Sequence, residues 1–307
     1  MDVSIIIVNY NTKDLIKNCI DSIYEQTKDI KFEIIVSDNG SVDGSIEMIK
    51  SEFPNVILIE NNANLGFGTA NNRGLKIAKG KYIFYLNSDT VLLNNAVKYF
   101  YDYWENSPEK DEIGALGGNL LDENFKLTHS FETFPSIKKI LNNTIFDFFR
   151  IIRLTVFFFL DESFSFTNSN QKIKKERALY YGNVDYIIGA DLFLKNNLDA
   201  QYDEKYFLYY EDTDLQMRLK QKNLKREIIN GPKIQHLEHK SNRFNKKIDY
   251  YKSISKTNLF LSSIIFLRKF NNNFFSILFL KLIISLCWLS PLLIKTNRKN
   301  LCKLWRL

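Results

Sequence analysis

The chain has 307 residues, of which 45% are apolar and 14% aromatic, with only 12 glycines and 5 prolines. This composition excludes a disordered or linker-rich chain and predicts one large domain with an appendage. The three cysteines, Cys19, Cys287 and Cys302, have neither the pairing density of a secreted scaffold nor the spacing of a metal site, so we expect a reducing compartment. The apolar start, MDVSIIIVNYNT, is too short and too poorly flanked for a signal peptide, which predicts a cytoplasmic protein.

The first 90 residues alternate between β-branched runs and patterns of helical period. Strands are expected at 3–8, 32–37, 56–60 and 81–86, and helices at 12–26, 43–52 and 69–79, with Gly80 placed to end the third helix. Strands without a polar face form a parallel sheet that helices cover on both sides. Because ligands bind such sheets beyond the carboxyl ends of the strands, the residues that follow each strand are the candidates for a site.

Polar residues follow the expected strands. No Gly-x-Gly-x-x-Gly follows the first strand, and no Gly-Lys-Ser or Gly-Lys-Thr occurs, which disfavours dinucleotide-binding and P-loop proteins. Asp38 opens the run DNGSVDGS after the second strand, where its carboxylate can accept a hydrogen bond from the imide of a uracil or thymine; the same run is also a good turn. Asn87, Ser88 and Asp89 end the fourth strand, where an acid can reach a divalent cation on a diphosphate or can cap a turn.

A second group of acids lies in the run FLYYEDTDLQMRLK, which presents Glu211, Asp212 and Asp214 close together. Carboxylates this near one another repel, which can raise the pKa of one of them and suit it to accept a proton from an alcohol. Acids are also favoured in the first turn of a helix, and a helix is expected to start near Asp212. His236, in KIQHLEHKS, is a metal ligand or an ordinary polar residue.

The basic excess of the chain lies in its C-terminal tail. Residues 240–307 contain 14 Lys and Arg and one acid, whereas residues 1–239 contain 28 basic and 34 acidic groups. The tail is also apolar, with FFSILFLKLIISLCWLSPLLI at 274–294, and basic apolar helices suit an anionic membrane surface better than nucleic acid. The alternative is two core helices with a solvated basic face. Lys281 and Pro291 favour a helix that lies in the membrane interface over one that spans the bilayer.

The middle of the chain, residues 120–181, loses the alternation of strands and helices. It contains IFDFFRIIRLTVFFFL at 145–160, which predicts a loop or helical insert that shapes an acceptor pocket or contacts lipid. Regular structure is expected to return at 184–194.

Six stretches, in this order, resemble the family 2 glycosyltransferases, which have the GT-A fold, and in particular the rhamnosyltransferase-like members of bacterial polysaccharide pathways. The stretches are VSIIIVNYNT, IIVSDNGSVDGS, NLGFGTANNRGLKIAKGKYIFYLNSDT, VDYIIGADLFL, YFLYYEDTDLQMRLK and QHLEHKS, and they cover most of residues 1–245. The fold class expected is α/β, with a Rossmann-like, mainly parallel sheet flanked by helices. We expect a GT-A domain at 1–245, with a nucleotide-sugar-binding half at 1–119 and an acceptor-binding half at 120–245, and then a helical membrane-associating segment at 246–307.

The resemblance also implies roles for single residues. The donor-binding residues that it implies are Val8, Tyr10, Asp38, Asn64, Gly66, Arg73, Ser88 and Asp89. Among them Asp89 would also bind Mg²⁺ or Mn²⁺, with His236 as a second metal ligand, five residues before Ser241. Asp212 would be the catalytic base, with Glu211 as the second candidate. The chain departs from the family at Asn87, where many members have Asp, which predicts weaker metal binding, and at 237–240, where glycines are often found.

These roles predict an inverting hexosyltransferase. It would move a sugar, plausibly rhamnose or another hexose, from a dTDP- or UDP-linked donor to a lipid-linked or polysaccharide acceptor at the cytoplasmic face of the inner membrane. Two alternatives are a sugar-phosphate nucleotidyltransferase and a degenerate, glycosyltransferase-like binding subunit, for which Asn87 is the only hint.

Overall fold

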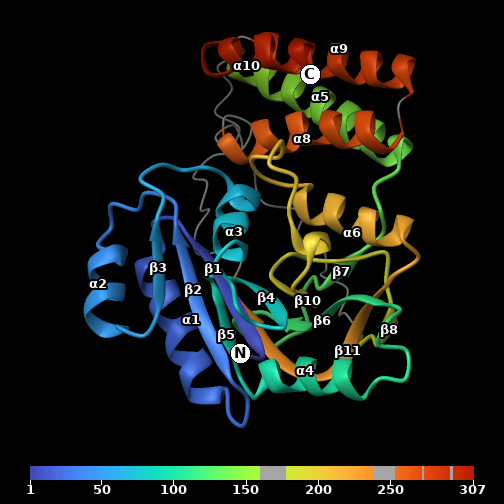
Figure 1. Cartoon of the computed structure of the whole chain (residues 1–307). Helices are drawn as coiled ribbons and strands as arrows, with labels where there is room; N and C mark the ends of the chain where they lie inside the picture. The colour runs from blue at the N-terminus through green and yellow to red at the C-terminus, as the bar shows by residue number, and fades with distance from the viewer. Residues whose placement is uncertain (160–177, 238–252, 272, 291–292) are drawn as a thin grey trace. The chain divides into compact units, whose positions relative to one another are not determined.

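The computed structural model describes residues 1–159, 178–237, 253–271, 273–290 and 293–307 (Figure 1). These residues form two compact units. Unit 1 contains the described residues of 1–134, 178–207 and 211–237, and unit 2 contains those of 135–159, 208–210 and 253–307. The predicted boundary at residue 245 divides the chain differently, because part of the middle region is grouped with the C-terminal helices.

Unit 1 begins with the alternation of strands and helices that the sequence predicts. Its first elements are β1 (Val3–Asn9), α1 (Lys13–Gln26), β2 (Phe32–Asp38), α2 (Ser45–Glu52), β3 (Ile57–Glu60), α3 (Phe67–Leu75) and β4 (Tyr82–Asn87). The later elements are β5 (Thr90–Leu92), α4 (Ala96–Asn106), β6 (Ile113–Leu121), β7 (Phe131–Glu132), β8 (Gly182–Asn183), β9 (Tyr186–Ile187), β10 (Asp191–Lys195), the short η1 (Leu198–Ala200), α6 (Glu211–Gln221) and β11 (Lys225–His236).

The main sheet is mixed and mainly parallel. Its strand order is β3-β2-β1-β4-β10-β6-β11-β5, with β8 paired to β11, and β7 and β9 form a separate small sheet. Strands β3, β2, β1 and β4 run parallel, and β10 enters antiparallel between β4 and β6. The carboxyl ends of the parallel strands therefore lie along one edge, and β10 begins at that same edge.

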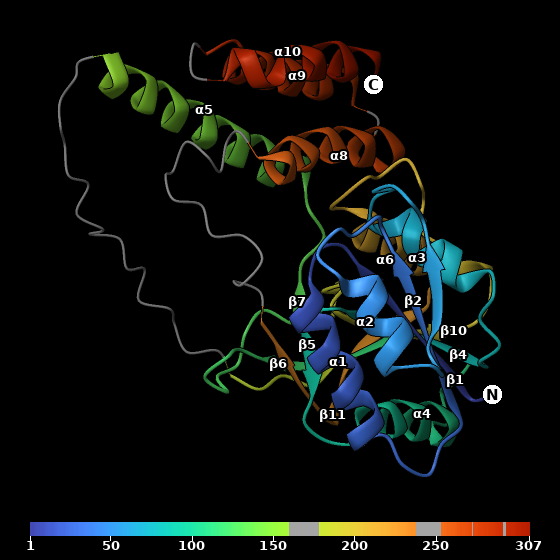
Figure 2. The same cartoon turned by 90° about the vertical axis from the view of Figure 1, so that its left-hand side faces the viewer.

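Both faces of the sheet are buried, which explains why its strands lack a polar face. Alternate residues of β1 point to opposite sides: Ile5 and Ile7 pack in the core with α1, α2 and α4, and Ile6 packs in the core with α3 and α6 (Figure 2). Phe193 of β10 continues the first core, stacking on Tyr82 with ring centroids 5.2 Å apart. The α/β class predicted from the sequence is confirmed.

The role predicted for Gly80 is wrong. Helix α3 ends at Leu75. Beyond it, the Ile77 N–H donates to the carbonyl three residues back, Gly74 O, at 3.1 Å, which is the spacing of a 3₁₀ turn. A Cβ on Gly80 would lie 2.3 Å from the Ser4 nitrogen, and the Gly80 N–H donates to Ser4 Oγ at 2.8 Å. Gly80 therefore permits close approach of the chain before β4 to β1.

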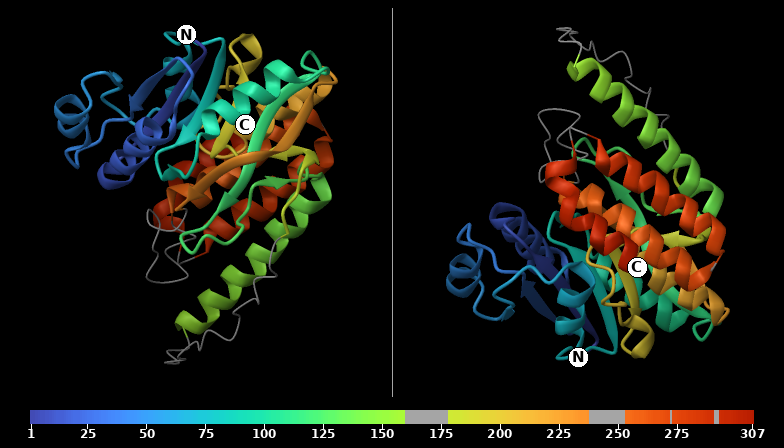
Figure 3. Two further views of the ribbon diagram at one scale, coloured as in Figure 1. Left: turned by 90° about the horizontal axis from the view of Figure 1, so that it is seen from below. Right: turned by 90° about the horizontal axis from the view of Figure 1, so that it is seen from above.

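Unit 2 consists of four described helices with a shared apolar core (Figure 3). They are α5 (Ile137–Phe159), α8 (Ile254–Phe270), α9 (Phe274–Leu289) and α10 (Ile294–Arg306). Ser253 caps α8 by accepting from the Lys256 N–H at 3.1 Å, and Asn273 caps α9 by accepting from the Ser276 N–H at 3.1 Å. Within the described residues, no helix is both long enough and apolar enough to cross a bilayer.

An ion pair joins the middle region of the chain to the C-terminal helices inside unit 2. Lys256 Nζ of α8 lies 2.6 Å from Asp147 Oδ2 of α5, and only 6% and 12% of these two side chains are exposed. A further link between helices is the hydrogen bond between Thr155 Oγ1 of α5 and Ser290 Oγ, 2.8 Å long. These contacts explain why α5 belongs with the tail.

Candidate functional site

The loop after β1 and the loop after β2 are joined by buried polar contacts. Asp38 is fully buried, and its Oδ1 accepts from the N–H groups of Gly40 and Ser41 at 2.9 and 2.8 Å. Its Oδ2 accepts from Asn9 Nδ2 at 2.7 Å. Asp38 therefore shapes the loop that follows β2. Direct base recognition by Asp38 stays a prediction.

The predicted base-binding residues of β1 lie at the same edge. Val8 is half-buried and pairs in register with Ser37 on one side and Asn87 on the other. Tyr10 is 47% exposed at the end of β1, so its ring is available for stacking on a planar ligand.

Thr12 connects the Asn87-Ser88-Asp89 turn after β4 to the loop after β1. Thr12 Oγ1 donates to Asn9 Oδ1 at 2.6 Å and is hydrogen-bonded to the Ser88 hydroxyl, with 3.0 Å between the two oxygens. The structure thus brings together the ends of β1, β2 and β4.

The loop before α3 depends on one glycine. Gly66 has φ +87°, and a Cβ there would lie 2.4 Å from the Phe207 carbonyl oxygen, so a larger residue does not fit. Asn64 Oδ1 accepts from the Gly66 N–H at 3.1 Å, and Asn39 Nδ2 donates to the Gly66 carbonyl at 3.2 Å. Because Asn39 follows Asp38 directly, this loop is anchored to the end of β2.

Arg73 is linked to this cluster through Asn61. It stands in the last turn of α3, about 10 Å along the helix from Gly66, and its Nη1 donates to Asn61 Oδ1 at 2.9 Å. It lines a surface cavity together with Asn72, Lys76 and Glu204. Asn61 Nδ2 in turn donates to Asn39 Oδ1 at 3.0 Å, which connects Arg73 to the loop after β2. The predicted contact of Arg73 with ribose or diphosphate stays a prediction.

Asp89 and His236 form the candidate metal pair. Asp89 Oδ1 lies 3.2 Å from His236 Nε2, and the two side chains are 16% and 7% exposed. Antiparallel pairing of β5 with β11 holds them together, because His236 is in register with Thr90 and the Leu237 N–H donates to the Asp89 carbonyl at 2.9 Å. Ser241, the other residue of the predicted motif, lies outside the described residues.

The chemistry of this pair fits Mn²⁺ or Mg²⁺ with additional oxygen ligands. A carboxylate and an imidazole are ligands of such ions, and the buried Oδ1 of Asn87, two residues before Asp89, has no hydrogen-bond partner among the described residues. No group of three or more His, Cys, Asp and Glu side chains suited to a metal occurs in the described part of the chain. Asp89 and His236 are thus the two side chains of the described residues that would hold a cation here.

The acid pair begins α6, and the two carboxyls differ in their surroundings. Asp212 is half-buried; its Oδ1 accepts from the Thr213 N–H at 2.7 Å and its Oδ2 accepts from the Gly189 N–H at 3.1 Å. Burial raises the pKa of Asp212, and these donors oppose the rise. Glu211 is 5% exposed, its Oε2 has no partner among the described residues, and burial together with the Asp212 charge raises its pKa well above the usual value. Asp212 is therefore the acid that ionises first and the more accessible base.

Asp214, the third acid of the run, has structural partners. Its Oδ2 lies 3.0 Å from Arg218 Nε, and its Oδ1 accepts from the Tyr206 hydroxyl at 3.2 Å. Backbone strain precedes the pair, because Tyr209 and Tyr210 both have φ +68°, a conformation that aromatic residues rarely adopt.

Three consecutive residues that the sequence analysis quoted without a role connect the two halves of the site. The Gly189 N–H donates to Asp212, the Ala190 carbonyl accepts from the Asn87 N–H at 3.0 Å, and Asp191 Oδ2 accepts from the Gly118 N–H at 2.7 Å. Asp191 is fully buried, and burial raises its pKa well above the usual value. The available signal was an acid inside the apolar run IIGADLFL.

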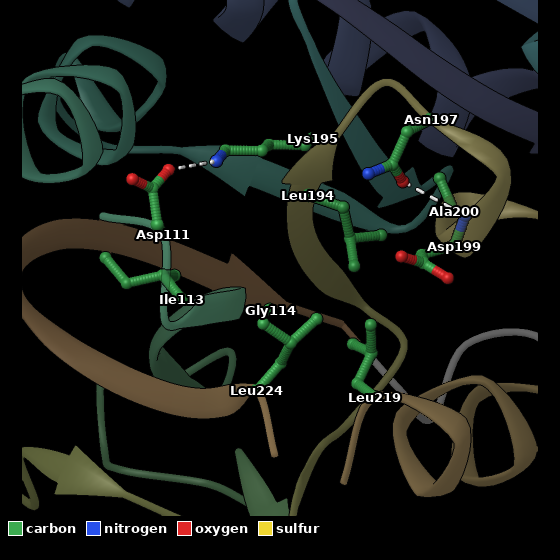
Figure 4. Close-up of a pocket in the computed structure, with 10 residues that line it drawn as sticks. All are labelled: Asp111, Ile113, Gly114, Leu194, Lys195, Asn197, Asp199, Ala200, Leu219 and Leu224. Carbon is green, nitrogen blue, oxygen red and sulfur yellow. Dashed lines mark hydrogen bonds and ion pairs between the residues drawn. The ribbon is translucent and has the colours of Figure 1, made fainter. Parts of the chain in front are cut away.

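A small pocket lies at the other end of β4 and β10 (Figure 4). It includes the ion pair between Lys195 Nζ and Asp111 Oδ1, 3.3 Å apart, and Lys195 is in register with Tyr82 at the start of β4. Its volume of about 120 Å³ is below the several hundred Å³ of a typical ligand site. It is therefore no competitor to the carboxyl edge as a nucleotide-sugar site.

A mainly parallel sheet with a carboxylate–imidazole pair and an acid pair near its carboxyl edge defines a GT-A-like α/β fold of the glycosyltransferase class. Residues 4–164, just over half of the chain, match the model of glycosyl transferase family 2. The chain belongs to glycosyl transferase family 2 and is a glycosyltransferase enzyme. This membership disfavours the nucleotidyltransferase alternative.

Two similar proteins illustrate the family. The poly(ribitol-phosphate) beta-glucosyltransferase of Bacillus spizizenii is 36% identical over 123 residues, which are 38% of this chain and 19% of that protein. The UDP-Glc:alpha-D-GlcNAc-diphosphoundecaprenol beta-1,3-glucosyltransferase WfaP of Escherichia coli is 40% identical over 123 residues, 36% of this chain and 48% of that protein. The chain thus spans less than half the length of both proteins.

A solved structure supports the fold. The mannosyltransferase PcManGT of Pyrobaculum calidifontis, in complex with GDP-Man and Mn²⁺, superposes with a TM-score of 0.53 and 15% identity, covering 97% of this chain and 74% of that chain.

Proposed function

We propose that this chain is an inverting, metal-dependent hexosyltransferase of cell-surface glycan synthesis. In this proposal it uses a dTDP- or UDP-linked sugar, with rhamnose as the first candidate, and glycosylates a lipid-linked or polysaccharide acceptor at the cytoplasmic face of the plasma membrane. The relatives described above, one acting on poly(ribitol-phosphate) and one on a diphosphoundecaprenol-linked sugar, support an acceptor of this kind. The basic C-terminal segments support the membrane location.

The observation that carries the proposal is the backbone connection between the base and the metal pair. Asp212 is held by the Gly189 N–H, and the adjacent Ala190 carbonyl is held by Asn87, two residues before Asp89. These two bonds support a base and a metal ligand held near each other, as a single in-line displacement between an acceptor hydroxyl and a donor diphosphate requires.

In the reaction, Asp212 accepts the proton of the acceptor hydroxyl while that oxygen bonds to the anomeric carbon and the bond to the nucleoside diphosphate breaks. Attack from the face opposite the leaving group inverts the anomeric centre. Asp89 and His236 would hold the cation, which when bound supplies positive charge beside the departing diphosphate. Tyr10 would stack on the base, and Gly66 lets the loop before α3 keep its shape.

A donor screen tests the proposal. The protein is incubated with UDP-, dTDP- and GDP-sugars, Mn²⁺ or Mg²⁺ and a membrane extract, and consumption of each donor is followed by mass spectrometry. We expect one donor to be consumed with release of its nucleoside diphosphate and a product of inverted anomeric configuration. If no donor is consumed by the native protein, or if a retained configuration is found, the proposal fails.

A further inference from the structure

Helix α9 carries large apolar side chains on two opposite faces. Its inner face, which includes Leu280, Ile284 and Trp288, is buried in the core of unit 2. Its outer residues recur at alternating intervals of four and three and are each about half exposed or more, which places them in one line along the helix. This α9 stripe consists of Phe275, Phe279, Leu282, Leu286 and Leu289.

The α9 stripe contains no charge. Lys281 is the one charged residue of α9, and it is half-buried with its Nζ 5.8 Å from the centre of the Trp305 ring. A helix that is apolar all round is usually buried on all sides. The exposed face of α9 therefore needs an apolar partner other than the described helices of unit 2.

Helix α5, which packs beside α9 in unit 2, presents a second exposed apolar line. The α5 stripe consists of Phe146, Phe149, Ile152 and Val156, which are between 41% and 66% exposed. Arg150 lies over the Phe146 ring, 5.9 Å from its centre. Seen from above, α5, α9 and α10 lie side by side (Figure 3, right). An apolar line with interspersed arginines is typical of a helix that lies in a membrane interface.

The positive charge of unit 2 favours an anionic partner for its exposed apolar side chains. Residues 253–307 contain nine Lys and Arg and no Asp or Glu, and five of the nine lie on α10. A second copy would bring two such basic surfaces together, which costs electrostatic energy, whereas anionic lipid headgroups complement them.

We propose that the α9 and α5 stripes together dock unit 2 onto an anionic bilayer surface, with both helices lying in the plane of the membrane. The apolar side chains enter the boundary between headgroups and acyl chains, and the basic residues of α10 and α5 contact the headgroups. This inference rests on the proposed membrane location but not on the proposed transfer reaction. It assigns part of the membrane surface to α5, which precedes the predicted membrane segment.

Vesicle binding by the 307-residue chain tests this surface. The test variant is the double change Phe279→Ser and Leu286→Ser, and the matched control is Val42→Ser and Ile77→Ser, which alters two exposed apolar residues of unit 1. Partition is measured by co-sedimentation with two kinds of vesicle: pure phosphatidylcholine, and phosphatidylcholine with roughly 30 to 40% phosphatidylglycerol. A second test variant, Phe149→Ser with Ile152→Ser, examines the α5 stripe.

We expect the native chain and the control to bind the anionic vesicles and to bind neutral vesicles much less. Each test variant should lose about tenfold or more of its partition coefficient, because each removes two apolar anchors. Thermal unfolding monitored by circular dichroism checks that the variants fold.

Three outcomes overturn the proposal: equal binding of native chain and α9 variant, equal binding to neutral and anionic vesicles, or a native dimer in lipid-free buffer that the α9 variant dissociates. Donor consumption with a water-soluble acceptor is measured in parallel. Its loss in the native chain would count against the transferase proposal and leave the docking result standing.

Discussion

Replacing Asp212 by Asn tests the assignment of the catalytic base most directly. The change keeps the size of the side chain and removes its ability to accept a proton. Both carboxylate oxygens of Asp212 accept backbone N–H bonds, from Thr213 at 2.7 Å and Gly189 at 3.1 Å. Because an amide has only one acceptor oxygen, one of these bonds is lost, which costs about 1 kcal/mol of folding stability. Loss of a general base costs about 10²- to 10⁴-fold in kcat.

The pH dependence of the activity tests whether Asp212 must be ionised. Burial raises the pKa of Asp212, and the base works only when ionised, so the native activity should fall as the pH drops through a value above the ordinary range of an aspartate. Initial rates are measured as nucleoside diphosphate release between pH 5 and 9, at saturating donor. The acidic limb of kcat should disappear from the residual activity of Asp212→Asn.

A neighbouring acid provides the matched control. Asp214 is fully buried but is paired with Arg218 at 3.0 Å, so Asp214→Asn should lower stability and leave the acidic limb in place for the folded fraction. The base assignment is refuted if Asp212→Asn keeps its rate within threefold of native, or if Glu211→Gln loses more activity than Asp212→Asn.

Three further predictions concern metal binding, pH and stability. Mn²⁺ added with a nucleoside diphosphate should raise the melting temperature of the native chain, and Asp89→Ala should abolish most of that rise in a thermal-shift assay. Folding raises the pKa of Glu211 above its unfolded value of about 4.5. Its contribution to the free energy of unfolding is therefore present below that value and is lost as the pH rises through the folded pKa, at about 1.4 kcal/mol per unit of pKa difference. Urea unfolding at pH 5, 7 and 9 should therefore show a weaker loss of stability with rising pH in Glu211→Gln than in the native chain; an equal loss contradicts the raised pKa. Lys256→Met removes one charge of a buried ion pair and should cost about 3 to 5 kcal/mol in urea unfolding, whereas Lys256→Met with Asp147→Leu should recover most of this loss; no recovery in the double variant contradicts the role of the ion pair.

Many of the candidate site residues could be predicted from the sequence because their positions depend on neighbouring residues in the chain. The end of a buried strand is readable from periodicity, so Asp38, Asp89 and the β1 loop were placed at one edge without coordinates. The acids of α6 were readable in the same way, since the helix begins at Glu211 as the pattern indicates. The sequence could not separate the two acids, because their difference is set by the Gly189 N–H and by burial.

Contacts between residues distant in the chain decided two features that the local sequence pattern does not show. Gly80 resembles a helix terminator, but its N–H and its missing side chain serve Ser4 of β1. Helix α5 lies in a region that follows the nucleotide-binding half, yet a buried bond between Asp147 and Lys256 places it with the tail.

By itself, the sequence determined the alternating strands, the order of the polar turns and the concentration of basic and apolar residues in the tail, because each follows from the chemistry of neighbouring residues. Only the tertiary structure showed that Asp89 contacts His236, which requires β5 and β11 to pair. It also showed that Asp212 is connected to Asn87 through the backbone of Gly189 and Ala190. Those contacts join residues far apart in the chain, and strand pairing and backbone hydrogen bonds between distant segments leave no periodic signal in the sequence.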